Sequence, residues 1–202
     1  MIVSTPSLLL AAAGTIARFG VAGATDRSVI DAFVATAGHV RAKRWDAAFL
    51  YHAGYWSHFD DRTGTSSWPL PATTRCHDLA RFARRERVLS SEAPRAGDVC
   101  LRWSPRRKVF VRTGVIIAVE PATERLDGTL QFECHTIEGG VTPTARLDGD
   151  RMGRVARFLS PAGGDRTIRW TDIEARELVT RRKDTAAMQA SRERDLELGS
   201  AA

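Results

Sequence analysis

The chain has 202 residues, 43% of them hydrophobic and 27% charged, which is typical of a folded globular protein. Its 30 Lys and Arg against 24 Asp and Glu give a net charge of +6, which suits an acidic partner such as a cell-wall polymer, an anionic membrane surface or nucleic acid. We expect no nucleic-acid function, because no basic run exceeds three residues, as in Arg181–Lys183, and no nucleic-acid-binding motif is present.

The three cysteines are widely spaced and form no CxxC pair. We therefore expect neither a zinc site nor a disulfide framework, and no other metal or cofactor. Lone buried thiols are the expected state of Cys76, Cys100 and Cys134, which fits a reducing compartment.

The first half of the chain predicts helices, beginning with two over residues 6–38. The apolar run in residues 8–13 is too short to span a bilayer, and residues 1–7 lack the Lys or Arg of a signal peptide. We therefore expect no membrane span and favour a cytoplasmic or assembly-associated protein over a secreted one. The second helix should begin at Thr25 or Asp26 and end at Gly38.

A third helix is predicted from Trp45, and its helical spacing places one apolar face in the core. That face consists of Trp45, Ala48, Phe49, Ala53 and Trp56. A polar loop rich in Gly and Pro follows, over residues 58–74. The fourth helix then places Cys76, Leu79, Ala80 and Ala83 on one side.

The second half predicts strands, at "VCLRW", "KVFVRTGVIIAVE", "TLQFECHTIE", "RVARFLS" and "RTIRW". A hairpin loop with Asp127-Gly128 near its end joins the second and third of these. A final helix should open with the capping box Thr171 to Glu174. Helices followed by an antiparallel sheet indicate an α+β fold in one domain over residues 1–180, with a charged tail or frayed helix over 181–202.

Five short segments in a fixed order carry a family resemblance over residues 44–170. They are "RWDAAFLYHAGY", "SSWPL", "APRAGDVCLRW", "FVRTGVIIAVE" and "HTIEGG". Together they resemble CHAP domains, the cysteine- and histidine-dependent amidohydrolases and peptidases with a papain-like fold. The resemblance implies N-terminal helices packed on a small antiparallel sheet, followed by a C-terminal helix.

The resemblance also implies that both catalytic residues are replaced. The family's nucleophilic Cys stands where this chain has Asp46, and its general-base His stands where this chain has Arg112. Glu138 is retained in the third segment, but the orienting Asn position is Gly140. A carboxylate attacks amides poorly, and an arginine stays protonated at physiological pH and cannot act as a base.

The two replacements preserve the signs of the thiolate–imidazolium pair of an active enzyme. We therefore expect Asp46 and Arg112 to form a bidentate salt bridge across the former active site, with Glu138 as a further acceptor for the guanidinium. Beside these vestigial positions, the candidate binding residues are Trp45, Tyr55, Trp68, Gly114 and Gly139.

The sequence thus favours a catalytically inactive CHAP-like protein that acts as a binding or structural module, with peptidoglycan peptide as the implied ligand. One alternative is a protein-interaction subunit of a phage-like or cell-envelope assembly. Another is an active peptidoglycan amidase or endopeptidase with relocated catalytic residues. The available Cys–His neighbours argue against relocation: Cys134 and His135 face opposite sides of a strand, and Cys76 and His77 point about 100° apart on a helix.

Overall fold

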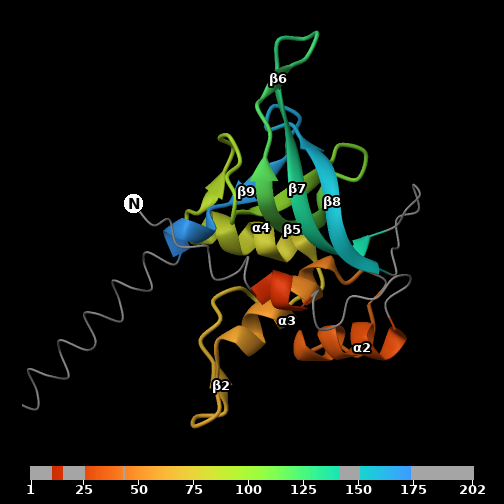
Figure 1. Ribbon diagram of the computed structural model, residues 1–202, viewed down its shortest axis with the longest axis vertical. Coiled ribbons are helices and arrows are strands. Elements are labelled where there is room, and N and C mark those ends of the chain that lie inside the picture. Colours follow the sequence, from red (N-terminus) through yellow and green to blue (C-terminus); the bar gives the residue numbers. More distant parts are fainter. Residues whose placement is uncertain (1–10, 16–25, 43, 142–150, 174–202) are drawn as a thin grey trace, which may run out of the picture. The chain divides into compact units, whose positions relative to one another are not determined.

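The computed structural model describes residues 11–15, 26–42, 44–141 and 151–173 (Figure 1). The chain divides into two compact units, residues 1–170 and 171–202. All of the helices and strands labelled below belong to the first unit. Helices and an antiparallel sheet within one unit confirm the α+β class.

Two predicted helices lie only partly within the described residues. Residues 11–15 of the first predicted helix are helical, as are residues 171–173 of the last. The remainder of both helices and the tail predicted over 181–202 lie outside the described residues. None of the helices in the described ranges is long and apolar enough to cross a membrane.

Helix α2, Arg27–Thr36, confirms the second predicted helix. The side chain of its N-cap residue Asp26 accepts a hydrogen bond from the Ser28 amide at 2.7 Å, which satisfies one of the free donors of the first turn. Gly38 adopts a φ of +75° just beyond the helix, a conformation that glycine adopts without strain.

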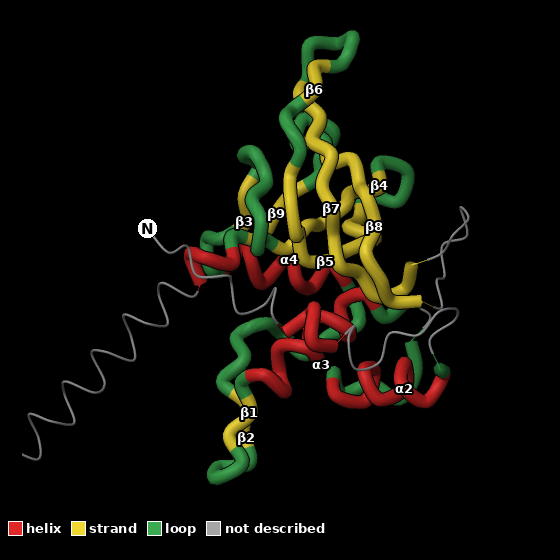
Figure 2. Tube along the Cα trace, in the orientation of Figure 1, coloured by secondary structure: helices red, strands yellow, loops and turns green. Residues whose placement is uncertain are grey.

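Helix α3, Asp46–Ser57, is more deeply buried than a single apolar face would require. Residues 46–50 are all buried, because α2 covers one side of the helix while strands β5, Val109–Val119, and β7, Leu130–Val141, cover another. Figure 2 shows α3 between α2 and the sheet. The prediction that Trp56 lies on the buried face is wrong, because this side chain is 54% exposed near the end of the helix.

Helix α4, Cys76–Arg85, buries the four predicted residues and packs against β5. The predicted loop between α3 and α4 contains a small hairpin, β1 (Phe59–Asp60) paired with β2 (Thr65–Ser66). Gly64, with a φ of +67°, forms part of its turn. The two strands are too short to give a readable alternation of polar and apolar residues, so the sequence did not reveal them.

Seven strands form the main antiparallel sheet, including β5 and β7. The others are β3 (Leu89–Ser90), β4 (Val99–Ser104), β6 (Thr123–Glu124), β8 (Arg151–Leu159) and β9 (Arg166–Ile168). The order is β3-β9-β4-β5-β7-β6, with β8 also paired to β7. The last strand in the sequence, β9, therefore lies between β3 and β4, while the β6–β7 hairpin extends from the top of the sheet in Figure 1.

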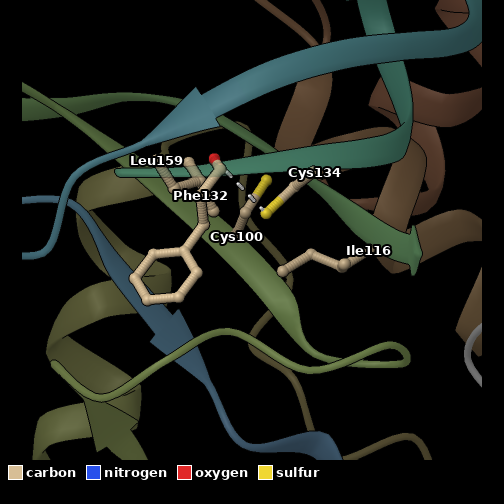
Figure 3. Close-up of a cluster of buried hydrophobic side chains, with 5 residues drawn as sticks. All are labelled: Cys100, Ile116, Phe132, Cys134 and Leu159. Carbon is tan, nitrogen blue, oxygen red and sulfur yellow. Dashed lines mark hydrogen bonds between the residues drawn. The ribbon is translucent and has the colours of Figure 1, made fainter. Parts of the chain in front are cut away.

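Side chains from four strands form an apolar cluster on one face of this sheet (Figure 3). Its members are Cys100, Ile116, Phe132, Cys134 and Leu159. On β7, the alternate residues Phe132, Cys134 and Thr136 are buried, whereas Leu130 is 52% exposed at the strand's end. Two of the three thiols thus belong to this cluster.

A buried ion pair joins the turn before β4 to the end of β9. Nη1 of Arg169 donates to Oδ2 of Asp98 at 2.6 Å, and Nη2 of Arg169 donates to the Ala93 carbonyl at 2.8 Å. Asp98 is fully buried and Arg169 is 4% exposed. This pair links residues 71 positions apart in the sequence and fixes the end of β9 against the turn before β4.

Candidate functional site

Asp46 and Arg112 form an ion pair where α3 begins against the sheet. Asp46 is the first residue of α3, and Arg112 lies on β5. Nη1 of Arg112 is 3.1 Å from Oδ1 and 3.5 Å from Oδ2 of Asp46. The expected salt bridge is therefore present, with one guanidinium nitrogen facing both carboxylate oxygens. The two side chains are 1% and 12% exposed, respectively, so the pair is almost entirely removed from water.

Burial dominates the electrostatics of the Asp46 carboxyl. Removal from water raises its pKa from an ordinary aspartate value to about 7, against the opposing effect of the Arg112 charge. The nearby charge of Glu138 raises the pKa further, and Arg44 lowers it. Asp46 is therefore a buried acid that titrates near neutrality and has a fixed cationic partner.

Gly140 completes the enclosure of this pair. Its carbonyl accepts a second hydrogen bond from Nη1 of Arg112. Its φ is +66°, and a Cβ at this position would overlap Oδ1 of Asp46 and lie 3.2 Å from Nη1 of Arg112. The position that the resemblance assigns to an orienting Asn therefore needs glycine here, because the Asp46 carboxylate occupies the space of a side chain.

Another buried ion pair, between Glu138 and Arg157, lies near the Asp46–Arg112 pair. Nε of Arg157 donates to Oε1 of Glu138 at 2.9 Å, and Nη2 donates to Oε2 at 2.7 Å. The Thr136 hydroxyl donates to Oε1 at 2.8 Å. Glu138 was expected to bind the guanidinium of Arg112, but its two-nitrogen fork comes from Arg157 on β8, and Glu138 is fully buried.

Gly114 and Gly139, two candidate binding residues, lie where neighbouring atoms in the core leave no room for a side chain. A Cβ on Gly114 would come within 2.5 Å of Cγ of Glu138 and 2.7 Å of the Ile137 carbonyl oxygen. A Cβ on Gly139 would come within 2.7 Å of Cβ of Phe49. Both glycines let β7 approach its neighbours closely, which places Glu138 in the interior.

The candidate aromatic residues differ in their environments. Trp45 is 2% exposed and packs on Phe33, with ring centroids 5.8 Å apart. Trp68 is 7% exposed and packs on Trp170 at 4.6 Å. These two indoles belong to the core, whereas Tyr55 is half-buried in a row of aromatic rings near the end of α3.

All three thiols are buried, and burial raises the pKa of each. The pKa of Cys134 rises to about 12, and those of Cys76 and Cys100 rise well above the ordinary thiol value. The charge of Asp46 contributes to the shift at Cys76, which places that thiol within electrostatic reach of the ion pair. At neutral pH these cysteines are thiols rather than nucleophilic thiolates.

Sequence reasoning missed Arg157, although a signal for it exists. On β8 the inward-facing positions alternate, and Arg157 shares a face with Leu159, which is 2% exposed. A charged residue on the core face of a strand needs a buried partner of opposite charge. Arg157 pairs with Cys134 of β7, and this register brings its guanidinium to Glu138. The sequence alone does not reveal which residues of β7 and β8 are paired.

Comparisons with known proteins give no relative for this arrangement: no protein-family model matches the chain, and neither the curated proteins nor the solved structures searched contain a match. Among the described residues, no group of three or more His, Cys, Asp or Glu side chains is placed to hold a metal ion.

Proposed function

We propose that this protein is a catalytically inactive CHAP-like domain with a papain-like arrangement, in which an ion pair occupies the position of the nucleophile and base. The observation that carries the proposal is the contact between Asp46, the first residue of α3, and Arg112, on the adjacent strand β5. Glu138 follows on the next strand, β7. This order of helix start, strand and neighbouring strand is the one the resemblance implies.

The chemistry of the pair supports a loss of hydrolysis. Arg112 cannot accept a proton from a nucleophile, and both oxygens of Asp46 lie within 3.5 Å of its Nη1. Asp46 is also 1% exposed, so its oxygens are not available to a substrate carbonyl while the pair with Arg112 is intact. The buried, protonated thiols offer no substitute nucleophile.

A binding or structural role remains for a scaffold of this kind, and its ligand is proposed from the resemblance and from charge. The resemblance implies peptidoglycan peptide. The net charge of +6 favours adsorption to anionic cell-wall polymers, with an affinity that falls as salt screens the charges. A protein partner in a cell-envelope assembly is the alternative.

Restoring the family's residues tests the proposal directly. The double variant Asp46→Cys/Arg112→His should gain measurable release of amino groups from purified peptidoglycan, while Asp46→Cys alone should not, because its thiol lacks a base. Loss of that new activity on Glu138→Gln in the double-variant background, with the fold shown by circular dichroism to be retained, would tie it to the same site.

The unaltered protein serves as the control and should release no amino groups. Turnover by the unaltered protein that is abolished by replacing Cys76, Cys100 or Cys134 singly with alanine would overturn the proposal in favour of an active hydrolase. Sedimentation of the unaltered protein with purified cell wall would support the wall ligand. Failure to sediment at low salt would count against that ligand and leave the protein partner.

A further inference from the structure

A cavity of about 530 Å³ opens beside the Asp46–Arg112 pair. It is bounded by the segment before α3, by the start of α4 and by the first residues of β5. Arg44 and Cys76 on its wall are within electrostatic reach of Asp46. Its volume falls in the range of pockets that hold small molecules.

The charged side chains that line this cavity are all cationic. Arg44, Arg75 and Arg107 contribute three guanidinium groups, and none of the ten lining residues is acidic. Among the described residues, none of these three arginines forms an ion pair with a carboxylate. Three guanidinium groups that line one cavity without an acidic neighbour in its lining favour an anionic ligand.

Arg44 gives the cavity a fixed polar group. Nη1 of Arg44 donates to the Val111 carbonyl at 3.0 Å, which orients this guanidinium against β5. Nδ1 of His77 is buried and has no hydrogen-bond partner within the described part of the chain. Because this nitrogen is shielded from solvent, it faces the protein interior, and Arg44 is the fixed polar group of the cavity wall.

The rest of the lining is apolar. Phe110 is 9% exposed and Cys76 is 5% exposed, and Val109 and Val111 extend the same wall. The acid nearest in sequence, Asp78 in the first turn of α4, is not part of the lining and accepts a hydrogen bond from the Thr73 hydroxyl. The cavity therefore combines an apolar wall with cationic groups that form no ion pair with a carboxylate among the described residues.

We propose that this cavity binds a small anionic ligand, with a carboxylate or phosphate group held by Arg44, Arg75 and Arg107 and an apolar body packed on Phe110. Guanidinium groups bind both kinds of anion through paired hydrogen bonds, so the two share one recognition chemistry. This site does not depend on the proposed loss of hydrolysis, because neither Asp46 nor Arg112 contributes to its lining.

Matched probes test the chemistry by titration calorimetry on the full chain. N-acetylphenylalanine and its amide differ only in the charge of one group, and phenyl phosphate supplies the other anion. Binding of either anion at least about tenfold tighter than the amide is expected, because a charge-assisted pair is worth more than a neutral one. The anion that binds more tightly indicates whether the ligand of this cavity carries a carboxylate or a phosphate.

Matched variants test the location. Arg107→Gln and Arg75→Gln should each weaken anion binding about tenfold. Arg106→Gln removes the same charge from the exposed residue next to Arg107, which does not line the cavity, and should change affinity less than about twofold. All three positions are exposed, so circular dichroism should show unchanged folding.

Three results would overturn the proposal. The first is equal affinity for N-acetylphenylalanine and its amide. The second is an equal loss of affinity in Arg106→Gln and Arg107→Gln, which would indicate a diffuse surface charge. The third is the absence of binding of either anion at low ionic strength, checked by a non-calorimetric method, since an exposed cationic cavity should bind most strongly there. None of these results bears on the activity of the Asp46→Cys/Arg112→His variant.

Discussion

Arg157 holds Glu138 through two parallel hydrogen bonds, Nε to Oε1 and Nη2 to Oε2, in the interior of the sheet. Nη1 of Arg112 donates to both oxygens of Asp46 and also to the Gly140 carbonyl. The two buried carboxylates thus have separate cationic partners. A substitution can therefore break one pair and leave the arginine of the other pair in place.

Breaking the Asp46–Arg112 pair from one side should destabilise the protein strongly. We expect Arg112→Met to lower the free energy of unfolding by about 3 kcal/mol at pH 8, because it leaves the Asp46 charge buried without its partner. The double variant Asp46→Asn/Arg112→Met should recover much of this loss. Urea denaturation measures both, with Arg106→Met as the exposed control. Additive effects of the two single changes would contradict the coupling.

The Asp46 carboxyl should make stability depend on pH between about 4 and 7. Its pKa is raised to about 7 in the folded state, so over this interval the folded chain keeps a proton that the unfolded chain has lost. The stabilisation is therefore complete below the unfolded pKa and is lost as pH rises, by at most about 1.4 kcal/mol per pH unit.

A pair of denaturation profiles isolates this effect. Asp46→Asn removes the titrating group but keeps its size, so the unaltered protein should lose stability relative to this variant as pH rises from 4 to 7, and the difference should level off above pH 7. Parallel profiles would show that Asp46 is ionised throughout and that Arg112 outweighs burial.

Gly140 should tolerate alanine poorly. Gly140→Ala places a Cβ against Oδ1 of Asp46 and also carries the strain of a positive φ. Gly64→Ala is a matched control, because its φ is +67° but nothing lies within 4 Å of the added Cβ. We expect the control to cost about 1 kcal/mol and Gly140→Ala at least about 2 kcal/mol more, measured by thermal or urea unfolding. Equal costs would mean that the ion pair can move aside.

The native protein should resist thiol reagents. Its only three cysteines are buried and protonated at neutral pH, so reaction with a disulfide reagent should follow unfolding rather than precede it. Ser91→Cys, at an exposed position, provides a rapidly reacting internal standard. Rapid modification of one native cysteine would show that its surroundings open in the folded state.

The sequence predicted the α+β class, because helical and strand periodicities are separated along the chain. It also predicted the contact between Asp46 and Arg112 through the family resemblance. It did not predict the exposure of Trp56, because helical spacing does not indicate where the covering elements end. The partner of Glu138 depends on the register between β7 and β8, which is set by pairing across a long connection rather than by local pattern.

The position of β9 has a consequence during synthesis on the ribosome. The outer edge of β4 is complete only when residues 166–168 arrive between it and β3. Until then the backbone amides and carbonyls on this edge of β4 have no strand partner. Asp98 also lacks Arg169, its ion-pair partner in the folded protein. We therefore expect the exposed edge of β4 to be open to strand pairing with other chains until the last residues of the first unit have been synthesised.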